Sequence, residues 1–464
     1  MMGDEYDGGD AAEHELDAEE ITSPNTDKHR VVCGALESLP RARQTPQAQS
    51  IYSRLLRLFA VHLVTPGRVL SNVTEHPLKP WSACVLHRPN VVTGKAPDSR
   101  GITANTHSRP AHYFSSTDMS TIYTSITRLL SVRTPVVLAP MAGASGGALA
   151  SQVTLGGGFG FLAPTYDGSE KFRDQLRIAR SNLNIPAQGL PIGVGFLGWK
   201  LETPDSPHVE LLKIALENQV QAIWLACGND TARWVEYIRK HDKETGKDRK
   251  TLIFIQVGTV DQAITAVNEF KPDVLVAQGN ESGGHGIAAA PPLFTLVSQV
   301  LAALPSGTAP PLLAAGGIIN GSQVAAYLTL GASGAVLGTR FLLTPETLYS
   351  ESRKQALLAA KTNSTMRSGM FDVLNNTLGW PSGVDGRGLR ISAVEEAHAG
   401  ANIDEVKQKF AEGAKQGDPG SIVIYAGIGA ESINEIKPAK DIVHELHDDI
   451  IERLKASSTL LSQA

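Results

Sequence analysis

The sequence has few cysteines, with Cys33, Cys84 and Cys227 the only ones among 464 residues. They are odd in number and form no CxxC or metal-ligand spacing, so we expect reduced thiols instead of a disulfide framework or a zinc site. An excess of basic residues is also lacking, because the formal net charge at pH 7 is -5. A chain without a global positive field is not expected to bind nucleic acid.

Long apolar runs are absent as well. No segment approaches the ~20 apolar residues that span a bilayer, and the acidic N-terminus is unlike a signal or transit peptide. The C-terminal letters LSQA do not form a peroxisomal address. Neither the phosphate loop GxxxxGK(S/T) nor the zinc motif HExxH occurs, which argues against a nucleoside triphosphatase or a zinc protease. We therefore expect a soluble, cytoplasmic protein that contacts no membrane.

Residues 1–118 differ in composition from the rest of the chain. Residues 1–30 contain ten acidic and two basic side chains, and the following stretch is rich in proline, serine, threonine, arginine and histidine. Such a composition buries too little apolar surface to offset the entropy lost when its backbone is ordered. We expect residues 1–118 to be a disordered N-terminal extension, in which 51–64 forms no more than a transient amphipathic helix.

From Thr134 onward, short apolar segments alternate with helical patterns, and the last helical pattern covers 351–361. Eight such pairs fit within about 230 residues, which is the length expected of a (β/α)8 barrel. Several segments are apolar on successive residues, as in parallel strands buried on both faces. An open doubly wound sheet seldom contains so many units. The sequence predicts an α/β protein with a (β/α)8 TIM barrel over 119–361 and a small C-terminal helical cap over 362–464.

The carboxyl ends of the strands are where a barrel carries its active site. The predicted seventh and eighth strands end in AAGGI (314–318) and LGTRF (337–341), next to the two loops that commonly hold a phosphate group. Glycines allow backbone N–H groups to approach an anion closely, although glycine pairs also form simple tight turns. The pattern favours a phosphate site at Gly316, Gly317 and Gly338.

The sixth predicted strand runs into the glycine-rich segment VAQGNESGGHG, with Gln278 at the barrel mouth and His285 in the following loop. An isolated loop histidine is usually a surface residue. Here, however, it is predicted to lie at the same end of the barrel as the glycine turns of the phosphate site. Histidine exchanges a proton near neutral pH, so we interpret His285 as functional. The first strand ends in LAPM, where Pro140 and Met141 form either a floor for an aromatic ring or ordinary packing.

A second motif indicates different chemistry. The letters GASGG, residues 143–147, match the G-x-S-x-G nucleophile elbow and place Ser145 between a strand and a helix. That elbow normally follows several strands and an oxyanion loop, whereas this one precedes nearly the whole barrel. The pattern is also easily met by chance in a chain with 44 glycines. A serine hydrolase that uses Ser145 is therefore the weaker alternative.

In order along the chain, LAPMAGASGGALA, PIGVGF, VAQGNESGGHG, LLAAGGI and LGTRF resemble the nitronate monooxygenases, formerly called 2-nitropropane dioxygenases. The resemblance runs from about Met119 to the C-terminal segment YAGIGAESINEIKPA. Its AQGNESGGHG element is specific to this family and its relatives, while APM and AAGGI are shared by many flavin barrels. The resemblance implies an FMN-dependent oxidoreductase that oxidises alkyl nitronates with O2 to a carbonyl compound and nitrite.

The resemblance also implies roles for individual residues. His285 would deprotonate a nitroalkane or stabilise the anionic nitronate. Cofactor contacts are expected from Ala139, Pro140 and Met141 at the isoalloxazine, from Gln278, Gly283 and Gly284 at the flavin, and from Gly316, Gly317, Gly338 and Thr339 at the phosphate. Gly195 and Gln256 are further cofactor positions, at which many members have an asparagine and a lysine.

A related family is the runner-up. The FMN-dependent enoyl-acyl-carrier-protein reductases share the GGH element but take hydride from NAD(P)H. For the favoured reading, the expected partners are a small-molecule nitronate and O2, and a homodimer is left open. No metal ligand set is expected.

Overall fold

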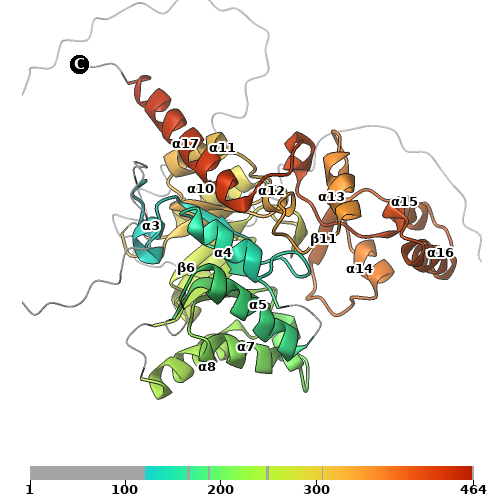
Figure 1. Ribbon diagram of the computed structural model, residues 1–464, viewed down its shortest axis with the longest axis horizontal. Helices are drawn as coiled ribbons and strands as arrows, with labels where there is room; N and C mark the ends of the chain where they lie inside the picture. The colour runs from blue at the N-terminus through green and yellow to red at the C-terminus, as the bar shows by residue number, and fades with distance from the viewer. Residues whose placement is uncertain (1–120, 165–167, 186–188, 247–249, 306, 462–464) are drawn as a thin grey trace, which may run out of the picture. The chain divides into compact units, whose positions relative to one another are not determined.

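The computed structural model describes residues 121–461, apart from 165–167, 186–188, 247–249 and 306 (Figure 1). These residues belong to one structural unit, Ala111–Ala464. The predicted disordered extension 1–118, its helical segment 51–64, and Cys33 and Cys84 lie outside the described residues. Within the described part of the chain, no helix is long and apolar enough to cross a membrane.

A barrel of eight parallel strands forms the centre of the fold. The strands follow the order β1-β9-β8-β6-β5-β4-β3-β2. They are β1 (Val136–Leu138), β2 (Phe161–Leu162), β3 (Leu190–Leu197), β4 (Val220–Ala226), β5 (Leu252–Val257), β6 (Val274–Gln278), β8 (Leu312–Ala315) and β9 (Gly334–Leu337). A parallel bridge joins Val137 of β1 to Phe159, just before β2, so the two edge strands meet. The predicted (β/α)8 barrel is confirmed.

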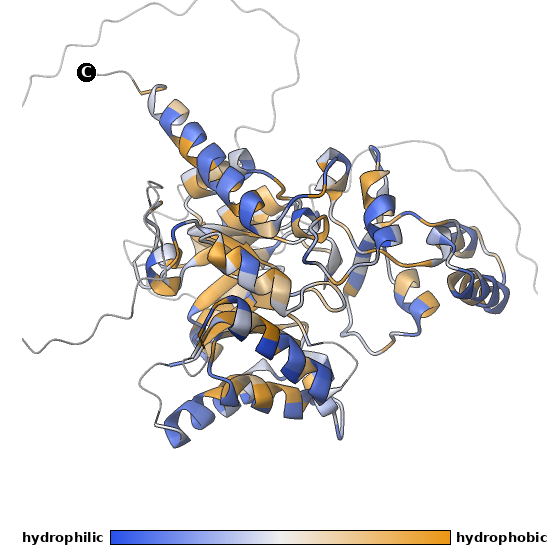
Figure 2. Cartoon of the chain, viewed as in Figure 1, coloured by the Kyte–Doolittle hydropathy of each residue, from blue (hydrophilic) through white to orange (hydrophobic). Residues whose placement is uncertain are grey.

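Helices cover the outside of the barrel (Figure 1). They are α4 (Gly147–Leu155), α5 (Ser169–Asn182), α7 (Pro207–Glu217), α8 (Thr231–Glu244), α9 (Val260–Thr265) with its π-helical continuation η1 (Ala266–Phe270), α10 (Leu293–Ala303) and α11 (Gly321–Leu330). Figure 2 shows the apolar strands, and helices α5, α7 and α8 with polar residues beside apolar ones. This arrangement explains the near-continuous apolar letters of the strands, which are buried on both faces.

The eighth outer position is filled by α17 (Ala439–Ser458), which packs against α11 and α4. The sequence analysis assigned this position to 351–361. That segment contains α13 (Glu351–Leu358), which contacts the short helix η3 (Ile428–Ser432) instead. The difference follows from the apolar faces, because α17 buries a stripe that includes Ile442, Leu446 and Ile450, whereas α13 buries only Lys354 and Leu357.

A second, antiparallel sheet lies beside the barrel and was not predicted. It has the order β10-β11-β7, with β7 (Gly284–Ile287), β10 (Thr365–Ser368) and β11 (Val384–Leu389). The strand β7 carries His285, so this histidine is part of a sheet and not of a loop. The remaining elements are α3 (Ser125–Leu130), α6 (Gly198–Glu202), α12 (Thr339–Leu342), α14 (Met370–Asn375), α15 (Ser392–His398), α16 (Ile403–Lys415) and η2 (Pro419–Ser421).

Aromatic rings fill the barrel interior. The ring of Phe161 lies 5.2 Å from Trp224 and 5.0 Å from Phe254, in edge-to-face arrangements. The Phe161 ring packs directly against the backbone at Gly193, where a Cβ atom would lie 2.1 Å from the ring. Large rings on β2, β4 and β5 therefore require a glycine on the intervening strand β3.

We expect Phe254→Ala to lower the free energy of unfolding by about 3–5 kcal/mol, because the ring is fully buried and its removal leaves a cavity. Urea denaturation measures the change. The matched control is Phe294→Ala on α10, where the ring is 61% exposed, and we expect a change within about 0.5 kcal/mol. Equal losses in the two variants would contradict the packing described for the barrel interior.

Candidate active site

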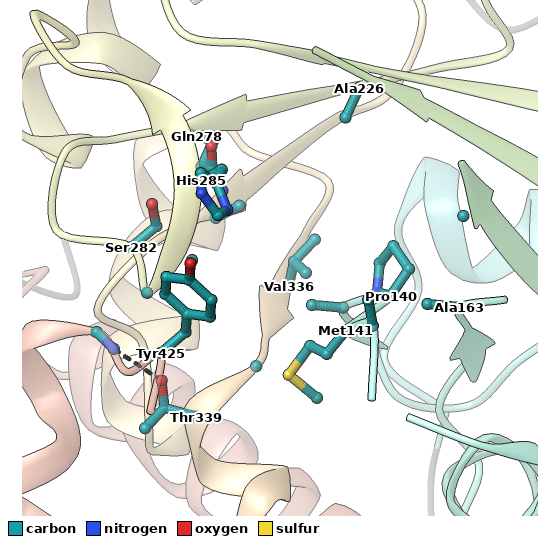
Figure 3. A pocket seen from close by; sticks show the side chains of 18 of the residues that line it. Pro140, Met141, Ala163, Ala226, Gln278, Ser282, His285, Val336, Thr339 and Tyr425 are labelled. Atoms are coloured by element: carbon teal, nitrogen blue, oxygen red, sulfur yellow. Dashed lines mark hydrogen bonds between the residues drawn. The ribbon is translucent and has the colours of Figure 1, made fainter. Parts of the chain in front are cut away.

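A cavity of about 460 Å³ opens at the carboxyl ends of the barrel strands. The structure brings every site residue predicted from the sequence to its wall: Ala139, Pro140, Met141, Gly195, Gln256, Gln278, Gly283, Gly284, His285, Gly316, Gly317, Gly338 and Thr339. Figure 3 shows Pro140 and Met141 on one side, and Gln278, His285 and Tyr425 on the other. The contacts of these residues with a flavin stay predictions.

Pro140 and Gly195 form one wall of the cavity as a matched pair. A Cβ atom at Gly195 would lie 2.3 Å from the Cβ atom of Pro140 and 2.4 Å from its Cγ atom. The proline ring therefore occupies the space that a side chain at Gly195 would need. This contact is a physical reason for a glycine at position 195.

Gln256 and Gln278 form a second pair, at the ends of β5 and β6. The Gln256 Nε2 atom donates a hydrogen bond to the Gln278 Oε1 atom over 2.8 Å. Gly286 packs against the same amide, because a Cβ atom there would lie 2.3 Å from that oxygen. With its oxygen engaged in this way, Gln278 presents its amide N–H groups as donors.

The glycine turns after β8 and β9 form a further part of the cavity wall. Gly316 and Gly317 have φ angles of 128° and 70°, which residues other than glycine rarely adopt. Nearby, the Gly427 N–H group donates a hydrogen bond to the Thr339 hydroxyl over 3.0 Å. The hydroxyl of Ser282 is buried beside the cavity and has no hydrogen-bond partner among the described residues. A buried hydroxyl of this kind is costly unless a ligand satisfies it.

His285 is held by residues that the sequence analysis did not single out. Its Nε2 atom lies 3.0 Å from the Asp372 Oδ1 atom. The imidazole stacks on the ring of Trp380, with ring centroids 3.6 Å apart and planes 11° apart. The Tyr425 ring lies 4.9 Å from the imidazole. All these partners come from the segment predicted as a helical cap, and no local pattern linked them to the histidine.

Ser145, the candidate nucleophile of the weaker alternative, lies outside the cavity lining. It is 1% exposed. Its Oγ atom accepts a hydrogen bond from the Met141 N–H group over 2.8 Å and lies 3.3 Å from the Met141 carbonyl oxygen. The hydroxyl therefore ties the turn after β1 to its own backbone, which is a structural role.

The side chains of His208 and Cys227 also line the cavity. Burial, and secondly the positive charge of Lys200, lower the pKa of His208, which favours its neutral form. Burial raises the pKa of the Cys227 thiol to about 12, so this free cysteine stays protonated and is a poor nucleophile. Over the described residues, no group of three or more His, Cys, Asp or Glu side chains forms a metal site.

The fold and the site together define a (β/α)8 barrel with a cofactor-sized cavity at the carboxyl ends of its strands. The family model described as nitronate monooxygenase matches residues 124–449. Because the match covers more than half of the chain, the protein belongs to the nitronate monooxygenase family. The resemblance recognised in the sequence is thereby confirmed.

Individual relatives agree with this assignment. The nitronate monooxygenase npaC of Metarhizium robertsii is 33% identical, with 68% of this chain and 90% of that protein covered. The nitronate monooxygenase of Neurospora crassa is 33% identical, with 70% and 91% covered. Among solved structures, a nitroalkane oxidase from Streptomyces ansochromogenes gives a TM-score of 0.58 at 25% identity, covering 72% of this chain and 100% of that one. FabK from Thermotoga maritima gives a TM-score of 0.57 at 27% identity, and the match covers 74% of this chain and 100% of that one.

We expect Gly195→Ala to lower the free energy of unfolding by about 1–3 kcal/mol, because the added Cβ atom would overlap the Pro140 ring. Thermal or urea denaturation measures the loss. The matched control is Gly369→Ala, where a Cβ atom would meet nothing within 4 Å and φ is -69°. We expect the control to stay within about 0.5 kcal/mol of the parent protein. A fully stable Gly195→Ala protein would contradict the pairing with Pro140.

Proposed function

We propose that this protein uses FMN to oxidise alkyl nitronates with O2 to a carbonyl compound and nitrite. The observation that carries the proposal is the convergence of three features in one cavity: the glycine turns after β8 and β9, the floor formed by Pro140 and Met141, and the imidazole of His285. Membership of the nitronate monooxygenase family supports the same conclusion.

The cavity suits a cofactor of this kind. Its volume of about 460 Å³ falls within the ~300–1,000 Å³ of small-molecule and cofactor sites. The turns at Gly316, Gly317 and Gly338 expose backbone N–H groups, and the orphaned Ser282 hydroxyl offers another donor. When bound, FMN would supply the acceptor for the substrate's electrons and pass them to O2.

In this proposal, some residues of the cavity bind the cofactor and one acts on the substrate. The phosphate would be held by Gly316, Gly317, Gly338 and Thr339. The isoalloxazine would be lined by Ala139, Pro140 and Met141, and the flavin would also be contacted by Gln278, Gly283 and Gly284. Gly195 and Gln256 would be further cofactor positions. His285 would act at the substrate, either by taking a proton from a nitroalkane or by stabilising the negative charge of a nitronate.

Anaerobic mixing of the purified protein with propyl-2-nitronate tests the proposal. We expect the visible flavin band to bleach and to return when O2 is admitted, because the substrate's electrons would enter the cofactor. The same experiment with NAD(P)H separates the proposal from the enoyl reductase alternative. Rapid bleaching by NAD(P)H together with none by the nitronate would overturn the proposed substrate class. A fluorophosphonate that labels Ser145 in flavin-free protein would instead support the hydrolase.

We expect His285→Ala to retain bound FMN but to lose turnover of a nitroalkane by ~100- to 10,000-fold, the range for removal of a general acid–base group. Steady-state O2 consumption and the flavin absorbance of the purified variant measure the two properties. His444→Ala is the control, because that histidine lies on α17 and does not line the cavity. Parental turnover in His285→Ala would remove this histidine from the chemistry.

A further inference from the structure

We propose that Asp372 is a positioning residue for His285: it holds the proton of the imidazole on Nε2 and thereby reserves Nδ1 for the substrate. The proposal rests on the proposed function for its consequence in turnover, but the arrangement itself is a property of the chain. Asp372 lies in α14, 87 positions after the histidine.

The hydrogen bonds around Asp372 indicate which partner donates. The Trp380 Nε1 atom lies 2.9 Å from Asp372 Oδ1, and indole N–H groups only donate. The Thr377 hydroxyl donates to the same oxygen over 2.8 Å. The His285 Nε2 atom lies 3.0 Å and 3.1 Å from the two carboxylate oxygens. A ring nitrogen that faces two carboxylate oxygens is the one that carries a proton, since a bare nitrogen there would meet only lone pairs.

The ring plane of His285 is fixed as well. Trp380 stacks on the imidazole while its N–H group bonds to Asp372, so one side chain restrains both members of the pair. Behind the imidazole, a Cβ atom at Gly386 would lie 3.4 Å from the His285 Nε2 atom and 2.9 Å from the Tyr425 ring. The side chains of His285 and Asp372 are only 11% and 7% exposed. The imidazole therefore has little room to turn over and exchange its two nitrogens.

This arrangement leaves Nδ1 as the reactive nitrogen. The imidazole lines the cavity, and Nδ1 has no hydrogen-bond partner among the described residues. In the neutral ring, Nδ1 carries a lone pair that can take the proton from the carbon beside a nitro group. The C–H bond breaks, its electron pair stays on the nitronate, and the proton forms the new N–H bond. The resulting imidazolium would lie between the Asp372 carboxylate and the nitronate anion, and both favour its positive charge.

The tautomer can be measured directly in the holoenzyme. Protein labelled with 15N-histidine gives two-bond 1H–15N signals that distinguish a protonated Nε2 from a protonated Nδ1. The chain has 13 histidines, so the His285 signals are identified by their absence in His285→Gln. We expect the neutral ring of the parent protein to carry its proton on Nε2. A proton on Nδ1 would overturn the proposal, and this readout needs neither substrate nor the Asp372 variant.

We expect Asp372→Asn to move the proton. The new amide oxygen still accepts from Trp380 and Thr377, so the amide N–H₂ group turns toward His285 and Nε2 becomes an acceptor. The proton then resides on Nδ1, and turnover of a nitroalkane, which needs the Nδ1 lone pair, falls by ~10²- to 10⁴-fold, as expected when a histidine is held in the wrong tautomer. A merely structural aspartate would lower stability without exchanging the two nitrogen signals.

Asp449→Asn is the matched control. Asp449 is also part-buried and accepts hydrogen bonds from Ser322 N–H and Oγ, but it lies on α17 and does not line the cavity. We expect the parental tautomer and turnover. An Asp372→Asn protein that keeps the proton on Nε2 and turns over at the parental rate would overturn the positioning role. A parent protein with the expected tautomer but no reaction with nitronates would contradict the proposed function and would still support the positioning role.

Discussion

The pairing of β7 with β11 is the constraint on which the candidate site depends. Glycine-rich backbone after β6 has little conformational preference of its own. Antiparallel pairing with β11 places His285 opposite Gly386 and fixes the histidine over the cavity. Arg367 reinforces the pairing, because it forms an ion pair with Asp385 and donates to the carbonyl oxygens of Asn280 and Gly286. The C-terminal segment thus builds the site instead of merely covering it.

This constraint explains why the backbone around His285 carries so few side chains. A Cβ atom at Gly283 would lie 2.5 Å from the backbone of Ala426 and Gly427, and one at Gly286 would lie 2.3 Å from the Gln278 amide oxygen. From the sequence, Gly283 was expected to contact a flavin and Gly286 was given no role. In the structure they are required first by the chain itself, which packs against both sides of the segment.

The barrel and the turns of the site were predictable because their signals are local. Each buried strand is a short apolar run, and each turn glycine follows such a run directly. The β7–β11 pair, Asp372 and Trp380 were missed because they meet His285 only across about ninety positions, with no shared periodicity. The eighth outer helix was predicted at 351–361, but α17 occupies that position. The reason is that α17 has the longer apolar stripe, which the alternation of apolar and helical patterns did not reveal.

The two departures from the family pattern are better understood as pairs than as single substitutions. At Gly195 the side chain is absent because Pro140 fills its space, and at Gln256 the amide is used to orient Gln278. In each pair the second member already lines the cavity, so the wall stays continuous although one residue differs. It follows that replacing Gly195 or Gln256 alone would disturb a neighbour before it affected any bound molecule. The residue type at one position of the wall has meaning only together with the side chain it packs against.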